Sequence, residues 1–265
     1  MAYYVSTLGL HSKLVKWRVG PRRAGGEERL GKRPDQRVGR RRRLPVTAGR
    51  VLDAAIAIAD RGGLDALTMR AVAARLGVQA MSLYKHVTNK DAILDGIVER
   101  MMLEMEPPPP GDWRAGMRHR AQGMRAVLLR HRWAAMLIES RTAPVPSRLR
   151  HHEASLRVMR DAGFSVELAY NAILSLDSYI YGFVAQEVWW PFAPGERPEL
   201  IKELAPDIDP AQFPRLVEMM GFVMSRAVSP AASPSSSSSG YDADFAFGLE
   251  LLLEGLDRAR RGGGC

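Results

Sequence analysis

The chain has 265 residues, of which 46% are hydrophobic and 25% are charged, a composition that allows one large globular domain or two smaller ones. Its richest apolar stretch, YNAILSLDSYIYGFVA, is interrupted by Asn171, Asp177 and Ser178, so we expect no membrane span, and we recognise no secretory signal at the N-terminus. The one cysteine, Cys265, excludes an internal disulfide and disfavours a cysteine-based metal site or nucleophile, which makes the cytoplasm the expected compartment.

The net charge of +9 is concentrated at the start of the chain. Residues 1–44 contain thirteen Lys or Arg and three Asp or Glu, a net charge of +10, whereas the rest of the chain is close to neutral at −1. The run GRRRRLP would suit a basic arm that contacts phosphates. A solvated tail, or an upstream start codon, explains the same composition equally well. We therefore expect residues 1–44 to be a basic disordered tail, with or without a role in binding.

Four short helices are predicted after the tail. The first fits VTAGRVLDAAIAIADRGG, which has apolar residues at helical spacing, a plausible N-cap at Thr47 and two glycines as a stop. The second fits TMRAVAARL, with Thr68 as its cap, and the third fits residues 80–86. The fourth begins near Asn89 and carries apolar residues as far as the run PPPP, so the four helices form one compact unit.

The four prolines cannot continue a helix, so residues 107–110 mark the boundary between a first domain, residues 45–106, and a second, residues 111–261. No part of the second domain alternates with a period of two, as a strand would. We predict helices at residues 113–128, 133–139, 147–161, 165–190, 211–227 and 241–260. The stretch SPAASPSSSSSG, within residues 228–240, is predicted to be a mobile loop. The fold class is therefore all-α.

The second and third predicted helices, joined at RLGVQAM, have the pattern of a helix-turn-helix. The third is short enough to enter a DNA major groove, where Ser82, Tyr84 and Lys85 would reach bases or phosphates and Met81 would contact a thymine methyl group. The start of the fourth helix at Lys90 offers amide groups and a cation to a phosphate. Each residue taken alone is explained equally well by packing or solvation. Their clustering on one short element favours a DNA interface.

The segment GGLDALTMRAVAARLGVQAMSLYKHVTNKDAILDGIVERM resembles the DNA-binding domain of the TetR family of bacterial transcriptional repressors, without a gap from about residue 46 to residue 105. RHRWAAMLIESR and MRDAGFSVELAYNAILSLDSYIYGFV are similar to the ligand-binding core of the tetracycline-repressor branch. The resemblance implies a three-helix helix-turn-helix head, joined by a connecting helix to a larger helical core for ligand binding and dimerisation. It implies a ligand-responsive transcriptional regulator rather than an enzyme.

The resemblance also implies which residues contact DNA. The family's contacts fall on Arg70, Ala80, Met81, Ser82, Leu83, Tyr84, His86 and Lys90, to which the chemistry of the third helix adds Lys85. The tetracycline repressor has Gln at the position of Ala80 and Pro at the position of Met81. Because Ala80 cannot make a bidentate amide contact with adenine, we expect a different operator sequence.

The expected effector site also departs from the tetracycline repressor. Ile138 stands where that protein has a His that coordinates drug-bound magnesium, and isoleucine cannot ligate a metal. We therefore expect no metal and no cofactor, and we favour an apolar or aromatic small molecule over a magnesium–tetracycline chelate. The expected pocket consists of Met117, Met124, Met136, Leu137, Met159, Tyr181 and Trp189, with Arg141, His151 and Asp177 as orienting polar groups. Any single methionine could equally be core filler.

The segments SVELAYNAILSLDSYIYGFVAQEVWW and FAFGLELLLEGL are apolar on more than one face, so we expect a homodimer built on a four-helix bundle, as in the family. A two-fold dimer with recognition helices about 34 Å apart would read a palindromic double-stranded operator. Effector binding in the core would shift the helices around it, swing the fourth helix and lower the affinity for DNA.

Two other functions fit the composition. An architectural nucleic-acid binder would use the basic arm, residues 1–44. A helical enzyme would use His151, Glu153 or Asp177 as acid or base, but no nucleophile, base and orienting group have a recognisable spacing. The run HHE also lacks the spacing that puts two His on one helix face, so the enzyme is the less expected alternative.

Overall fold

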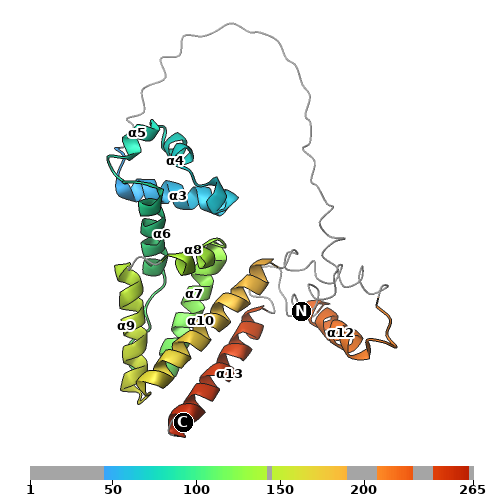
Figure 1. The fold of residues 1–265 in the computed structure, drawn as a ribbon. Helices are drawn as coiled ribbons and strands as arrows, with labels where there is room; N and C mark the ends of the chain where they lie inside the picture. The colour runs from blue at the N-terminus through green and yellow to red at the C-terminus, as the bar shows by residue number, and fades with distance from the viewer. Residues whose placement is uncertain (1–44, 142–144, 190–207, 229–240, 263–265) are drawn as a thin grey trace. The chain divides into compact units, whose positions relative to one another are not determined.

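The computed structural model describes residues 45–141, 145–189, 208–228 and 241–262, and in these ranges it contains helices and no strand (Figure 1). The all-α prediction is therefore confirmed. No helix within these ranges is long and apolar enough to cross a membrane. The predicted basic tail, residues 1–44, and almost all of the predicted mobile loop, residues 228–240, lie outside the described residues, and Val228 ends a helix.

The head is made of short helices in the order that the sequence predicts. Their bounds are α3 Ala48–Gly62, the 3₁₀ turn η1 Leu64–Ala66, α4 Met69–Leu76, α5 Ala80–Leu83 and α6 Lys90–Glu104. The hydroxyl oxygen of Thr47 accepts a hydrogen bond from the Arg50 amide over 3.3 Å, and that of Thr68 accepts one from the Ala71 amide over 3.1 Å. Both predicted N-caps are confirmed, and each satisfies an amide that the first helical turn leaves without a partner.

The turn between α4 and α5 depends on Gly77, whose φ of +69° places it in the left-handed region that side chains disfavour. The helix α5 is shorter than predicted, because residues 84–86 form a turn instead of a third helical turn. The Leu83 carbonyl accepts hydrogen bonds from the amides of His86 and Val87 over 2.8 and 3.0 Å. This turn lets the chain reach Asn89, whose side-chain oxygen accepts from the Ala92 amide over 2.8 Å and caps α6.

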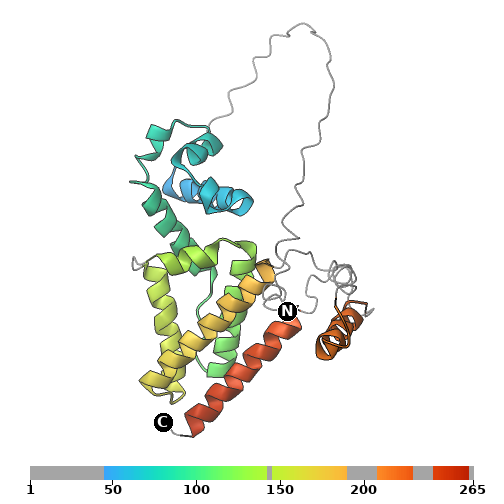
Figure 2. The same cartoon turned by 45° about the vertical axis from the view of Figure 1, so that its right-hand side comes forward.

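The larger helical core follows the four prolines, as predicted (Figure 2). Its helices are α7 Trp113–Arg130, α8 Ala134–Ser140, α9 Pro146–Asp161, α10 Val166–Trp189, α12 Pro214–Val228 and α13 Tyr241–Arg261. The helix α7 contacts α9 and α10, and α10 also contacts α9 and α13. The predicted apolar stripe of α7 is buried here, since Met117, Met124 and Leu128 are each at most 3% exposed.

The helices α10 and α13 approach closely at Tyr179, whose ring stacks on Phe245 with centroids 5.3 Å apart. The Tyr179 hydroxyl donates a hydrogen bond to the Phe245 carbonyl over 2.7 Å. A Cβ atom on Gly248, one turn further along α13, would lie 2.5 Å from the Tyr179 hydroxyl oxygen. Only a glycine therefore fits against this ring.

Candidate DNA interface and effector core

The recognition element α5 and the turn after it expose the polar and apolar groups that DNA contact requires. Met81 is 74% exposed and Tyr84 is 48% exposed, and Lys85 and His86 are exposed beside them. Ala80 and Ser82 are partly exposed. The position of these side chains leaves them accessible to a DNA groove.

Two further cations flank this element. Arg70 is exposed in the first turn of α4, and Lys90 is exposed as the first residue of α6. Within the described residues, Arg70, Lys85 and Lys90 form no ion pair, so their charges are not neutralised by neighbouring carboxylates. Unpaired cations next to an exposed helix suit contact with phosphates.

Leu83 does not belong to this exposed set. Its side chain is fully buried in the head, at 0% exposure, so the expectation that it contacts DNA is wrong for the side chain. Leu83 lies at the end of the four-residue helix α5, and its burial attaches that helix to α3 and α4. Its contribution to recognition is therefore to hold the exposed residues in place.

The predicted effector pocket is only partly assembled. Met117, Met124, Leu137 and Met159 are each at most 3% exposed inside the core. Met136 is 71% exposed, so its assignment to the pocket is wrong. The short helix α8 buries one narrow face, formed by Ala134, Leu137 and Ile138, and position 136 lies outside it. The Trp189 side chain lies outside the described part of the structure.

Arg120 is a buried cation that the sequence analysis did not select. Its side chain is 2% exposed, and its Nη2 donates to the Asp177 Oδ1 over 2.7 Å, which joins α7 to α10. Its Nε has no hydrogen-bond partner in the described structure. The signal was present in the sequence, because Arg120 lies three residues after Met117 and four before Met124, within the apolar stripe of α7. A charged residue at such a position requires a buried partner.

His151 lies in the same part of the core and is 3% exposed. Neither of its ring nitrogens has a hydrogen-bond partner of normal geometry among the described residues. Burial lowers the pKa of His151 to about 4, and the charges of Arg120 and His152 act in the same direction, while the Met105 backbone opposes them. The imidazole is therefore neutral at pH 7, with one nitrogen as donor and the other as acceptor.

Two more polar side chains complete this buried cluster. Burial lowers the pKa of His152, against the opposing charge of Asp177. Burial also raises the pKa of Tyr181, and the carboxylates of Glu139 and Asp177 raise it further. We call Arg120, His151, His152, Asp177 and Tyr181 the core polar cluster. At pH 7 its only charges are those of the Arg120–Asp177 pair.

Arg141, which the sequence analysis assigned to the pocket, instead connects the core to the head. Its Nε donates to the Asp95 Oδ1 over 2.7 Å and its Nη1 donates to the Asp91 Oδ1 over 2.9 Å, both on α6. The pairing raises the pKa of Arg141, mainly through the hydrogen bond to Asp95. Its guanidinium is therefore hydrogen-bonded to the connecting helix α6, and its assignment as an orienting group of the pocket is wrong.

Glu99 forms a second connection between α6 and the core. Its carboxylate accepts from the Ser147 amide over 3.0 Å and from the Ser147 hydroxyl over 2.5 Å, at the start of α9. Arg150 adds an ion pair at 3.4 Å. Burial raises the pKa of Glu99, but the Ser147 hydrogen bonds and the Arg150 charge outweigh burial and lower it. A movement of α9 would therefore be transmitted to α6.

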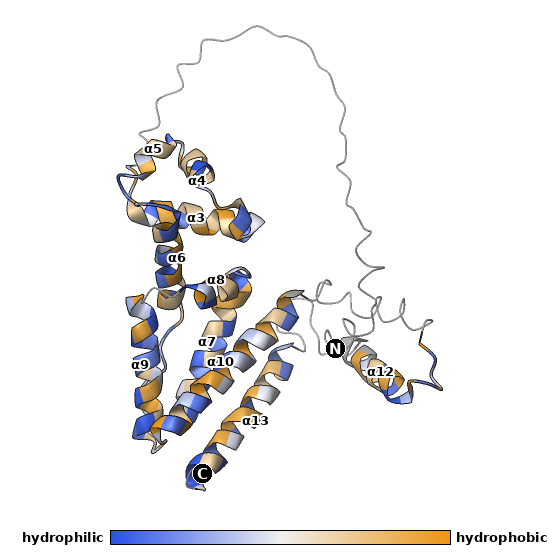
Figure 3. Cartoon of the chain, in the orientation of Figure 1, coloured by the Kyte–Doolittle hydropathy of each residue, from blue (hydrophilic) through white to orange (hydrophobic). Residues whose placement is uncertain are grey.

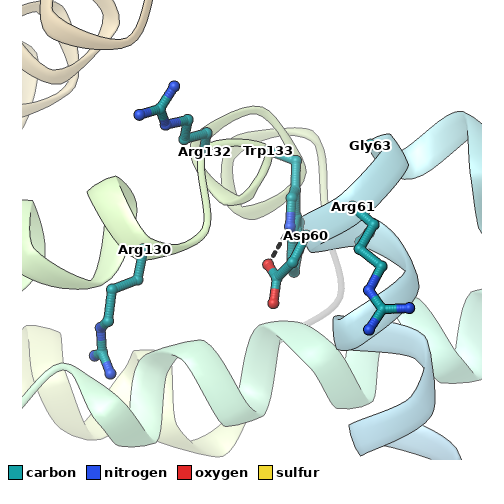
Figure 4. Close-up of a pocket in the computed structure, with 7 residues that line it drawn as sticks. Asp60, Arg61, Gly63, Arg130, Arg132 and Trp133 are labelled. Carbon is teal, nitrogen blue, oxygen red and sulfur yellow. Dashed lines mark hydrogen bonds between the residues drawn. The ribbon is translucent and has the colours of Figure 1, made fainter. Parts of the chain in front are cut away.

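A third connection joins the end of α3 to the turn between α7 and α8. The Trp133 Nε1 donates a hydrogen bond to the Asp60 Oδ1 over 2.8 Å (Figure 4). The His131 Nδ1 lies 2.8 Å from the same oxygen. An open pocket of about 380 Å³ lies here, lined by Ala59, Asp60, Arg61, Gly63, Arg130, Arg132 and Trp133. Figure 4 shows the three arginine side chains pointing in different directions, so they do not converge on one point. We assign this pocket no ligand.

Within the described ranges, no cluster of three His, Cys, Asp or Glu could hold a metal ion. Ile138, at the position of the tetracycline repressor's metal-binding His, is 1% exposed in the apolar face of α8.

The head is a helix-turn-helix with exposed recognition residues, and several hydrogen bonds connect it to a helical core with buried polar groups. This combination defines a ligand-responsive DNA-binding regulator. Comparisons with known proteins agree with this class. Residues 51–97 match the family described as "Bacterial regulatory proteins, tetR family", and residues 106–260 match "Tetracyclin repressor-like, C-terminal domain". The chain belongs to the TetR family of transcriptional regulators, in its tetracycline-repressor-like branch.

Individual relatives cover most of the chain. The transcriptional repressor DrrR1 of Streptomyces coeruleorubidus is 33% identical over 218 residues, which are 80% of this chain and 77% of DrrR1. The class A tetracycline repressor from transposon 1721 in Escherichia coli is 32% identical over 214 residues, 79% of this chain and 90% of that protein. ActR of Streptomyces coelicolor, solved without ligand, has a TM-score of 0.65 and 26% identity, covering 83% of this chain and 99% of ActR. A second ActR structure contains actinorhodin.

Proposed function

We propose that this regulator is a homodimeric repressor, which binds a palindromic operator through α5 and is released when a small, mainly apolar or aromatic effector enters the core. The operator contact is supported by four exposed side chains on α5 and the following turn, those of Met81, Tyr84, Lys85 and His86. Two cations beside them, Arg70 and Lys90, form no ion pair within the described residues. Such a protein would act in the cytoplasm, where operator DNA lies.

The proposed dimer interface is formed by α10 and α13. On α10, Val166, Tyr170 and Leu174 are each more than half exposed and lie four residues apart on one face. On α13, Phe247 and Leu251 are exposed with the same spacing. Figure 3 shows apolar residues along both helices. Two such helices from each subunit would bury these faces in a four-helix bundle and set the spacing of the two heads.

The proposed release depends on the connections to α6. An effector held among α7, α9 and α10 would displace these helices, and the bonds of Ser147 with Glu99 and of Arg141 with Asp95 would pass the displacement to α6. The recognition elements of the dimer would then no longer match the operator spacing. An effector can shift this equilibrium only to the extent that it binds the released conformation more tightly.

The type of effector follows from the apolar lining and from a neighbour. The buried methionines of α7 and α9 provide a polarisable lining that adapts to aromatic shapes. ActR, which shares this fold, has been solved with actinorhodin bound. We propose an effector of comparable apolar character for this chain, and we do not assign actinorhodin to it.

The test first uses the full chain to select bound sequences from random double-stranded DNA. The affinity for the selected operator is then measured by gel-shift titration. The proposal predicts enrichment of a palindrome and a loss of affinity of at least about tenfold for Tyr84→Ala, because a recognition contact typically contributes about 1–3 kcal/mol. Leu149→Ala, which also removes a large exposed side chain but from α9, is the control and should bind like the wild type. Recovery of no common sequence would contradict the proposal.

The same assay separates the architectural alternative. Deletion of residues 1–44 should lower the affinity and its dependence on salt while the preferred sequence stays the same. If the basic arm were the binder, the deletion would abolish binding and Tyr84→Ala would change little. A helical enzyme is not favoured, because His151 is buried and Asp177 is paired with Arg120.

A further inference from the structure

The core polar cluster contains buried hydrogen-bonding groups that the fold does not use. The Arg120 Nε–H and both ring nitrogens of His151 are buried without a hydrogen bond of normal geometry in the described structure, and the Met105 backbone carbonyl accepts a weak hydrogen bond from one imidazole nitrogen. The two residues lie on the neighbouring helices α7 and α9, close enough for the Arg120 charge to act on the His151 ring. Buried polar groups without partners are rare, because each loses its hydrogen bonds to water without replacement.

The unused groups have a defined pattern of donors and acceptors. The Arg120 Nε–H can only donate, and a neutral imidazole donates from one nitrogen and accepts at the other. Because the Met105 carbonyl takes the imidazole N–H, a molecule that satisfies the two remaining atoms must provide one acceptor for the Arg120 Nε–H and one donor for the other His151 nitrogen. A carbonyl oxygen beside a hydroxyl group provides this combination, because the carbonyl accepts and the hydroxyl donates.

The charge of the cluster selects against an anionic molecule. The Arg120 charge is already compensated by Asp177, whose Oδ1 lies 2.7 Å from the Nη2. Glu139 is also near, and its own partner is Arg148 at 3.5 Å. A carboxylate brought to the Arg120 Nε would therefore be a second negative charge beside Asp177, without a second cation to balance it. Burying an unbalanced charge costs more free energy than one added ion–dipole contact recovers.

We infer that the effector is a neutral, mainly apolar molecule with a carbonyl next to a hydroxyl group, and that Arg120 and His151 recognise these two groups. This inference rests on the proposed function, because it places the effector among α7, α9 and α10. Arg120 keeps its ion pair with Asp177 and uses its Nε–H for the carbonyl oxygen. His151 accepts a hydrogen bond from the effector hydroxyl at one nitrogen and donates to the Met105 carbonyl from the other.

The test uses flavonol and flavone, two flat aromatic molecules that differ by the single hydroxyl beside the carbonyl, together with a flavone carboxylate as the anionic probe. Affinities for the full chain are measured by fluorescence titration at neutral pH. The wild type is expected to bind flavonol about tenfold more tightly than flavone, as one net hydrogen bond from the hydroxyl to His151 would give, and to bind the carboxylate most weakly.

Two variants and a control assign this preference to the residues. Arg120→Lys keeps a cation for Asp177 but removes the Nε–H, and His151→Phe keeps a flat ring but removes both nitrogens. His151→Phe should bring the flavonol preference over flavone to about threefold or less, because only flavonol has the hydroxyl that donates to His151. Arg120→Lys should weaken both probes by a similar factor of about threefold or more and keep the preference, because both have the carbonyl. Flavone that still binds His151→Phe shows that the core is folded. Met159→Leu changes a buried apolar neighbour and should keep the full preference.

Several outcomes would overturn the inference: equal binding of flavonol and flavone by the wild type, as expected if only water occupies these groups, no binding of flavonol, tightest binding of the carboxylate, a flavonol preference that survives His151→Phe, or unchanged binding of both probes by Arg120→Lys. Gel-shift titration with the same probes separates this result from the proposed function. Flavonol that binds with the expected preference but does not release operator DNA would contradict the repressor mechanism alone. Operator release by flavone and flavonol with equal affinity would contradict this inference alone.

Discussion

Arg141, at the end of α8, lies with its Nε 2.7 Å from the Oδ1 of Asp95 in the middle of α6, and this bond fastens the connecting helix to the core. The bond is charge-assisted and partly shielded, with the two side chains 21% and 33% exposed. Charge-assisted hydrogen bonds of this kind fix geometry as well as adding stability. The orientation of α6 therefore depends on a contact with the end of α8 in the core.

Arg141→Gln should uncouple the head from the core. The variant loses the charge-assisted bonds to Asp95 and Asp91, so α6 no longer follows α8, at a cost in stability of about 1 kcal/mol or less because the pairs are partly exposed. Gel-shift titration with a releasing effector should show that the variant needs a higher effector concentration. Arg157→Gln, which removes an exposed pair on α9, is the control. An unchanged effector response in Arg141→Gln would show that this contact does not transmit the signal.

Leu83 should matter for folding of the head and not for base recognition. Its side chain is fully buried, so Leu83→Ala should destabilise the head by about 2–5 kcal/mol, measured by urea unfolding. Leu83→Met keeps the volume and should bind the operator with nearly wild-type affinity. If Leu83→Met retained stability but lost operator affinity, the Leu83 side chain would contact DNA after all.

The local features of the head were predictable because they depend on near neighbours in sequence. Thr47 and Thr68 cap helices through amides three residues away, so a cap pattern alone identifies them. The position of Arg120 in the apolar stripe of α7 indicated a buried cation, but its partner could not be predicted, because Asp177 is 57 residues further along the chain and no local pattern connects them.

Short helices give weaker signals. The seven residues of α8 are too few for a hydropathy pattern to fix which face is buried, and Met136 was therefore assigned to the wrong side. Arg141 was misassigned for a different reason. Its acidic partners lie on the connecting helix, and only the packing of α8 on α6 brings them together.

Gly248→Ala should destabilise the protein by about 1–3 kcal/mol, as overpacking typically does. The added Cβ would lie 2.5 Å from the Tyr179 hydroxyl oxygen and 2.8 Å from its Cε2, and the ring cannot move without losing its hydrogen bond to the Phe245 carbonyl. Gly123→Ala in α7 is the matched control, because no atom lies within 4 Å of the added Cβ. The control should be neutral or stabilising by up to about 1 kcal/mol through helix propensity. Urea unfolding of both variants checks the prediction, and equal stability of the two would contradict it.

His151 should make the protein less stable in mild acid. Its pKa is lowered to about 4 in the folded protein, compared with 6.5 in the unfolded chain, so the unfolded chain binds the proton first as the pH falls. The contribution of His151 is constant above pH 6.5, and stability is lost progressively between pH 6.5 and about 4, by up to about 3 kcal/mol.

His151→Phe cannot gain this proton. Its free energy of unfolding should therefore fall less than that of the wild type between pH 7.5 and pH 4.5, and the difference should be most of the loss of about 3 kcal/mol expected for His151. Urea unfolding at the two pH values measures the difference. His119→Ala removes an exposed histidine, whose side chain is 44% accessible, and should keep the pH dependence of the wild type. If His151→Phe lost as much stability in acid as the wild type, protonation of His151 would not be what destabilises the core, and the acceptor role inferred for its neutral imidazole would be contradicted.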